Sequence, residues 1–258
     1  ISIDGAIAIT RNTSSSCTTR PIHTNTGTRN SDIPGARRLI TVTERFTAPT
    51  VEAIPVISSY GDALGIRAFA NRVNLATDLA DTEFVAMRDL VKVPLINMES
   101  AIQHPCQSLA DWKTMDELQV PKKGGKFVLS WSWHPKALPL AVPSATLHMA
   151  AMRGMDVTVV RPDGFELPPE VMEKARKGAA LSGGSVRETN DRADAYEGAH
   201  VIYAKEWSST RHYGDRVADQ KLREQLQDWI VDEPSFAKAQ PAARFMHCLP
   251  VRRGVAVT

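Results

Sequence analysis

The chain has 258 residues, of which 43% are hydrophobic and 23% are charged. This is the composition of an ordinary globular protein, so fibrous and disordered classes are excluded. The formal net charge of +2 is too balanced to indicate a nucleic-acid partner. At roughly 150 residues per domain, the length allows one large domain or two small ones.

The predicted elements alternate from about residue 61 onward, where short apolar runs are separated by helical patterns. Strands are predicted at 62–66, 94–98, 127–131, 156–160, 185–188, 199–204, 229–231 and 244–247. Helices are predicted at 80–91, 105–118, from Pro143 to just before Gly154, at 169–181, after Asp191 and at 218–228. Such alternation is typical of βαβ units with parallel sheets. We therefore predict an α/β protein with two domains, residues 1–118 and 119–258, each a parallel sheet flanked by helices with the active-site cleft between them.

The cysteine spacing and the apolar pattern limit which cellular compartment and which metal ligands are compatible with the sequence. Cys17, Cys106 and Cys248 are far apart and have neither zinc-site nor disulfide spacing, which predicts a cytoplasmic protein without a metal. No long apolar run occurs, so we expect no membrane span. Residues 1–10 are apolar but contain Asp4 and lack a basic n-region, so we expect no signal peptide there.

Charged or imidazole side chains follow five of the predicted strands. Ligands of open α/β sheets bind beyond the carboxyl ends of the strands, so these positions are the informative ones. If the strand ends converge, they form a cationic cleft between the two halves, which suits an anionic, phosphorylated substrate. The side chains concerned are Arg67, Glu99 with His104, His134 with Lys136, Lys205, and Arg252 with Arg253.

Two motifs carry most of the functional signal. The first, residues 104–111 with the sequence HPCQSLAD, opens a predicted helix, whose free backbone N–H groups favour anions. The second, residues 247–253 with the sequence HCLPVRR, joins a strand end to two arginines that can bind phosphate or carboxylate. Taken singly, each has a plainer interpretation, a helix-capping histidine in one case and a solvated arginine pair beside a buried cysteine in the other.

Together the two motifs resemble the aspartate/ornithine carbamoyltransferase family, and the resemblance extends over about residues 51–258. Residues 131–143 and 203–207, together with Glu99, are similar to substrate loops of its N-acetylornithine and N-succinylornithine members. No Gly-x-Gly-x-x-Gly or Walker A sequence supports the alternative of a nucleotide-binding domain. The resemblance implies transfer of the carbamoyl group of carbamoyl phosphate to the δ-amine of N-acetylornithine. N-succinylornithine and ornithine remain alternative substrates, and a catalytically inactive relic remains an alternative function.

The resemblance also implies roles for individual residues in a homotrimeric enzyme that needs no metal, cofactor or covalent intermediate. The carbonyl of carbamoyl phosphate is polarised by Thr19, Arg67 and His104. Catalysis then consists of aligning two substrates and stabilising the developing negative charge. The implied carbamoyl phosphate site comprises Ser16, Thr19, Arg20, Arg67, His104, Gln107, Cys248 and Leu249. The implied acyl-ornithine site comprises Glu99, His134, Lys205 and Arg252.

The chain departs from the family pattern near its beginning. The phosphate loop of the family reads Ser-x-Arg-Thr-Arg, whereas residues 16–20 read SCTTR, so Thr18 replaces a cationic side chain. Residues 21–50 are rich in Thr, Ser and Arg and hold no Trp, and the family's last helix would lie beyond Thr258. Divergence with function kept, loss of function and a shifted reading frame all remain open explanations. We expect low or no activity from the chain as it stands.

Overall fold

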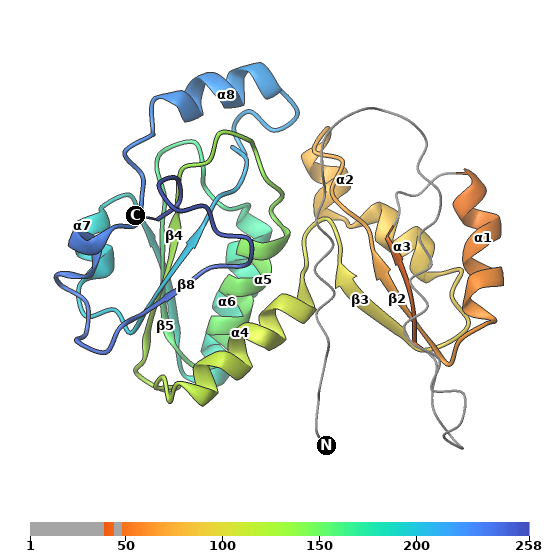
Figure 1. Cartoon of the computed structure of the whole chain (residues 1–258), viewed down its shortest axis with the longest axis horizontal. Helices are drawn as coiled ribbons and strands as arrows, with labels where there is room; N and C mark the ends of the chain where they lie inside the picture. Colours follow the sequence, from red (N-terminus) through yellow and green to blue (C-terminus); the bar gives the residue numbers. More distant parts are fainter. Residues whose placement is uncertain (1–38, 44–47, 258) are drawn as a thin grey trace.

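The computed structural model describes residues 39–43 and 48–257, and it contains two parallel sheets (Figure 1). The first sheet has the strand order β1-β2-β3. We call this sheet and helices α1–α3 the first sheet unit. Its elements are β1 (Leu39–Thr43), α1 (Ala48–Ser58), β2 (Ala63–Arg67), α2 (Leu75–Leu79), α3 (Thr82–Arg88) and β3 (Leu95–Glu99).

The second sheet has the strand order β6-β5-β4-β7-β8, and every neighbouring pair is parallel. We call this sheet and its helices the second sheet unit. Its elements are β4 (Lys126–Trp131), α5 (Ala141–Met152), β5 (Asp156–Val160), α6 (Pro169–Ser182), β6 (Ser185–Thr189), α7 (Arg192–Tyr196), β7 (Val201–Lys205), α8 (Arg216–Glu224), η1 (Glu233–Phe236) and β8 (Arg244–Met246). The predicted fold class, two parallel sheets flanked by helices, is confirmed.

Helix α4 (Pro105–Glu117) follows the end of β3 and packs along α5, so it connects the two sheet units (Figure 1). Its first turn is set by Pro105 at the start and by His104 as the N-cap residue. Proline suits this position because the first helical N–H has no intrahelical partner. The HPCQSLAD motif therefore lies where the two sheet units meet.

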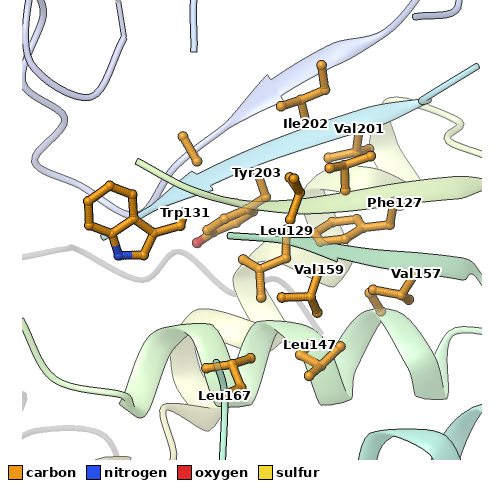
Figure 2. Packing of buried hydrophobic residues seen from close by; sticks show 14 of the residues in the cluster. Phe127, Leu129, Trp131, Leu147, Val157, Val159, Leu167, Val201, Ile202 and Tyr203 are labelled. Atoms are coloured by element: carbon orange, nitrogen blue, oxygen red, sulfur yellow. The ribbon is translucent and has the colours of Figure 1, made fainter. Parts of the chain in front are cut away.

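Each sheet unit has its own apolar core. The larger core surrounds β4, whose residues from Phe127 to Trp131 are all buried, as expected for the central strand of a parallel sheet. Figure 2 shows Leu147 of α5 facing the side chains of β4 and β5. The smaller core contains Leu64 and Ile66 of β2, packed against Ile54 and Met87. Burial of this apolar surface is the main stabilising contribution to both units.

Three local predictions differ from the structure. The helix predicted at 80–91 is the shorter α3 alone, because Asp81 directly before it adopts φ +54° and accepts hydrogen bonds from Ser100 Oγ and the Ala101 N–H. The strand predicted at 229–231 is reduced to an isolated bridge from Val231 to Val257. Strand β1, helices α1 and α2 and the short helix η1 have no counterpart among the predicted elements. In the described part of the chain, no helix is long and apolar enough to cross a membrane.

Candidate functional site

The ends of β2 and β3 bring Arg67, Glu99 and His104 together. Arg67 Nε donates to Glu99 Oε2 at 2.7 Å, and His104 Nε2 lies 3.6 Å from the same oxygen. The Glu99 side chain is nearly buried at 8% exposure, whereas the Arg67 side chain is 41% exposed. The buried carboxylate thus holds the arginine in place while leaving part of its guanidinium open to an anion.

The ring of His104 is fixed in one tautomer. Its Nδ1 accepts the backbone N–H of Gln107 at 3.3 Å, as an N-cap side chain does. An accepting Nδ1 places the proton on Nε2. Burial lowers the pKa of His104, although Glu99 opposes this shift. A neutral imidazole with a proton on Nε2 can donate a hydrogen bond to a carbonyl oxygen that gains negative charge.

One turn further along α4, Gln107 and Asp111 continue this cluster toward the second sheet unit. Gln107 Nε2 donates to Asp111 Oδ1 at 2.9 Å. Burial raises the pKa of Asp111 to about 6, while contacts with Gln107, Tyr203 and His247 lower it. Tyr203 belongs to β7 and His247 follows β8. Asp111 is therefore the residue of the first motif that lies next to the second sheet.

A compact charged group lies at the ends of β7 and β8. His247 Nε2 is 3.2 Å from Glu206 Oε2, and Lys205 Nζ is 3.7 Å from that oxygen. The Nδ1 atom of His247 contacts the carbonyl oxygen of Cys248. Acceptors at both ring nitrogens require an imidazolium. Burial lowers the pKa of His247, but the bonds to Cys248 and Glu206 outweigh it and raise the pKa to about 9.

Glu206 has the opposite shift. Burial raises its pKa, but the His247 hydrogen bond and the charges of Lys205 and His247 lower it to about 2. The group therefore contains one anion and two cations, all of them almost fully buried. The surplus positive charge suits the binding of a carboxylate or another small anion.

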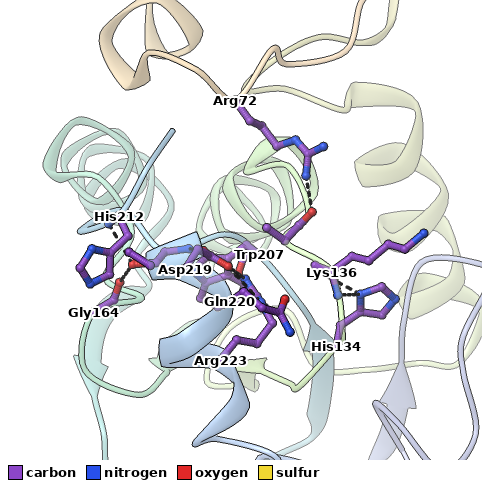
Figure 3. A network of polar contacts seen from close by, with 12 residues as sticks. Arg72, His134, Lys136, Gly164, Trp207, His212, Asp219, Gln220 and Arg223 are labelled. Atoms are coloured by element: carbon purple, nitrogen blue, oxygen red, sulfur yellow. Dashed lines mark hydrogen bonds and ion pairs between the residues drawn. The ribbon is translucent and has the colours of Figure 1, made fainter. Parts of the chain in front are cut away.

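The loop after β4 brings His134 to this charged group. Burial lowers the pKa of His134, and Glu206, Arg252 and Lys205 act on it electrostatically. Its Nδ1 accepts the backbone N–H of Lys136 at 3.0 Å, which fixes the loop (Figure 3). The Arg252 side chain is exposed and makes no hydrogen bond or ion pair within the described residues. It remains available to a ligand.

The two sheet units touch through loops near these clusters. The Arg72 guanidinium donates to the Ala137 carbonyl (Figure 3), and the Tyr213 hydroxyl donates to Asp78 Oδ2 at 2.7 Å. Gly214 has φ +90°, and a Cβ there would lie 2.4 Å from the Val73 carbonyl oxygen. These loops line a cavity of about 360 Å³ whose wall contains Arg72, residues 135–139 and residues 212–216.

The structure thus gathers the predicted residues into two clusters. Arg67, Glu99, His104 and Gln107 form the first. His134, Lys205 and Arg252 lie together in the second, with Cys248 beside them and Leu249 exposed at the surface. Within the described residues no hydrogen bond or ion pair joins the clusters directly. Ser16, Thr19 and Arg20 lie outside the described residues.

Sequence reasoning missed three residues of the site, Glu206, Asp111 and His247, the last of which opens the second motif but received no role. Glu206 is the carboxylate that balances Lys205 and His247, and its signal is an acidic residue directly after a fully buried strand. Asp111 ends the first motif, and its signal is a carboxylate two turns into a helix that packs against its neighbours, where few carboxylates are buried.

Two α/β units with cationic side chains at their strand ends define an α/β protein whose candidate site lies beyond its parallel strands, where such sheets hold their ligands. Sequence models of one family cover most of the chain. The model described as "Aspartate/ornithine carbamoyltransferase, carbamoyl-P binding domain" matches residues 37–117, and the one described as "Aspartate/ornithine carbamoyltransferase, Asp/Orn binding domain" matches residues 141–258. The chain belongs to the aspartate/ornithine carbamoyltransferase family, as its motifs had indicated.

Two relatives show which members of the family this chain is similar to. An N-acetylornithine carbamoyltransferase of Xanthomonas campestris pv. campestris is 39% identical over 210 residues, which is 80% of this chain and 61% of the relative. An N-succinylornithine carbamoyltransferase of Bacteroides thetaiotaomicron is 33% identical over 81% of this chain and 60% of the relative. The chain therefore spans about three fifths of the length of these relatives.

Solved structures agree with this relationship. A crystal structure of acetylornithine transcarbamylase complexed with acetylcitrulline has a TM-score of 0.75 and 38% sequence identity. A mutant of N-acetyl-L-ornithine transcarbamylase complexed with PALAO has a TM-score of 0.76 and 37% identity. Both matches cover 81% of this chain and 63% of the solved chain.

Proposed function

We propose that the protein transfers the carbamoyl group of carbamoyl phosphate to the δ-amine of N-acetylornithine, giving N-acetylcitrulline and phosphate. The observation that carries this proposal is the Arg67–Glu99–His104 cluster at the start of α4, which offers a guanidinium and a neutral imidazole N–H to one small anion. The similarity to N-acetylornithine carbamoyltransferases supports the same reaction.

In this proposal the first cluster polarises carbamoyl phosphate. His104 Nε2 donates to the carbonyl oxygen, the open edge of Arg67 faces the same group, and Gln107 binds the carbamoyl amine. Ser16, Thr19 and Arg20 would hold the phosphate, with Cys248 and Leu249 contributing mainly backbone contacts. As the amine attacks, negative charge builds on the carbonyl oxygen and on the leaving phosphate, where fixed donors are most effective.

The second cluster would bind the acyl-ornithine. Lys205, Arg252 and His134 would bind and orient its anionic and carbonyl oxygens, and Glu99 would face its δ-amine from the first cluster. Holding the amine close to the carbamoyl carbon replaces an unfavourable encounter in solution by an aligned contact. The buried ion pairs of Glu206 with Lys205 and His247 support this role, because they carry a surplus positive charge.

We also propose the organisation of the whole protein. Residues 1–118 would form the carbamoyl phosphate domain and residues 119–258 the acyl-ornithine domain. The protein would act as a homotrimer in the cytoplasm. Support for the domain division comes from the two sheets and from the separate family models for residues 37–117 and 141–258.

Calorimetry and a product assay test the proposal. Carbamoyl phosphate is added first, followed by N-acetylornithine, N-succinylornithine or ornithine, and citrulline products are measured. We expect binding of carbamoyl phosphate and slow turnover, fastest with N-acetylornithine. Absence of carbamoyl phosphate binding would contradict the proposal, binding without turnover would favour the inactive relic, and faster turnover of N-succinylornithine would change the substrate.

The variant Thr18→Arg tests whether the altered phosphate loop limits the rate. It restores the cation that the family loop carries, and one charge-assisted bond to phosphate contributes about 1.5–3 kcal/mol. We expect carbamoyl phosphate affinity to rise by about tenfold or more. Thr13→Arg adds the same charge outside the motif and serves as the matched control.

A further inference from the structure

Asp111 is a buried carboxylate that the proposed reaction does not use. It lies two turns into α4 with only 5% of its surface exposed. Oδ1 accepts from Gln107 Nε2 at 2.9 Å. Within the described residues, neither Oδ2 nor the hydroxyl of Tyr203 has a hydrogen-bond partner of good geometry, although the two groups lie close enough to affect each other's pKa.

Stability alone does not explain this carboxylate. Asp219, the buried aspartate of α8, is paired with Arg223 at 2.7 Å and also accepts the Ser209 backbone N–H. Asp111 has no such ion pair, and its burial raises the pKa to about 6. An uncharged side chain of the same shape would be easier to bury there. A residue that costs stability inside a ligand site is commonly kept for function.

An ionised carboxylate has a specific effect on its amide neighbour. It can only accept hydrogen bonds, so Gln107 must present its NH₂ group to Asp111. The planar amide then directs Gln107 Oε1 away from Asp111. A neutral amide in place of Asp111 could donate as well as accept, and it would allow Gln107 to bind in either orientation.

We propose that Asp111 is a positioning residue that turns the Gln107 carbonyl oxygen toward the ligand and so selects a carbamoyl group over an acetyl group. The NH₂ of carbamoyl phosphate can donate to Gln107 Oε1, whereas the methyl of acetyl phosphate cannot. A site built to accept a substrate N–H leaves a polar group unpaired when the analogue lacks it. This inference rests on the proposed carbamoyl transfer.

The test compares carbamoyl phosphate with acetyl phosphate in the full chain. For the unaltered protein, calorimetry should give tighter binding of carbamoyl phosphate. In Asp111→Asn the affinity for carbamoyl phosphate should fall by about tenfold, while the affinity for acetyl phosphate stays the same. Gln107→Ala should abolish the preference, and adding Asp111→Asn to it should change nothing more.

Asp219→Asn is the matched control, because it neutralises a buried aspartate of α8 that makes no contact with Gln107. It should lower the melting temperature and leave the preference unchanged, whereas Asp111→Asn should not lower the melting temperature. If Asp111→Asn keeps the full preference for carbamoyl phosphate, the inference is wrong while the proposed reaction stands.

An NMR measurement without ligand keeps the two hypotheses separate. The side-chain NH₂ protons of Gln107, assigned with Gln107→Ala, should exchange with solvent more slowly in the unaltered protein than in Asp111→Asn. If the unaltered protein binds neither phosphate, the proposed reaction fails and the exchange rates decide whether Asp111 positions Gln107. Equal rates in the two proteins overturn the positioning role.

Discussion

The two sheet units carry their charges in different ways. In the first unit, Arg67 is 41% exposed and one buried carboxylate, Glu99, holds it. In the second, Lys205, Glu206 and His247 are all almost fully buried and are held by one another. The first arrangement leaves hydrogen-bond donors open to a ligand. The second holds three charges at fixed positions, and removing these charges from water costs free energy of folding. Substitutions should therefore affect mainly binding and turnover in the first unit and mainly folding in the second.

The largest effect is expected from Glu206→Gln. Removing the shared anion leaves Lys205 and His247 as buried cations without their carboxylate, which costs about 3–5 kcal/mol. Urea denaturation should show this loss. Glu117→Gln, which breaks the exposed pair with Lys113, should cost less than about 1 kcal/mol. Similar losses from both substitutions would show that the buried group of the second unit does not depend on its shared anion.

His104→Asn separates catalysis from folding in the first cluster. Asparagine caps helices well, so the free energy of unfolding should change by less than about 0.5 kcal/mol. The loss of the imidazole donor should remove about 2.7–4 kcal/mol of transition-state stabilisation. Steady-state kinetics and urea denaturation give the two numbers. Asp215→Asn, a cap exchange at α8, should change neither, and a large loss of stability in His104→Asn would show that the histidine is mainly structural.

The stability of the folded protein should depend on pH through His247. Its pKa rises from 6.5 to about 9 on folding. A raised pKa stabilises the fold fully below the unfolded value of 6.5, and the contribution is lost as pH rises through about 9. The loss is roughly 3 kcal/mol and should be visible by urea denaturation at pH 6 and pH 10. In Glu206→Gln this dependence should flatten, and an unchanged slope would rule out the ion pair as its source.

The smallest effect is expected at the contact between the units. Tyr213→Phe removes the hydrogen bond to Asp78, and a typical net loss is about 1 kcal/mol. Asp78 keeps its backbone N–H donors from Asn71 and Arg72, so the loop itself should persist. The free energy of unfolding from urea curves checks the size, and an unchanged value would mean that the bond does not form in solution.

Much of this arrangement could be predicted because it depends on local sequence. Pro105 after His104 marks a helix start, and the apolar run at 127–131 marks a central strand. The start of α3 after Asp81 could not be predicted, because Asp81 is held by hydrogen-bond donors from another part of the chain, Ser100 Oγ and the Ala101 N–H. The ion pair of Glu206 with His247 spans 41 residues. The two residues of this ion pair come together only when β7 and β8 pair in the folded sheet.

Gly214 has a consequence for protein engineering. Its α-carbon faces the Val73 carbonyl oxygen so closely that an added Cβ would come within 2.4 Å. That clash involves backbone on both sides, so no side-chain rotation can relieve it. A single methyl group introduced by Gly214→Ala would act as a wedge between the two sheet units, and any function that requires them to stay in contact could be switched off without altering a charged residue.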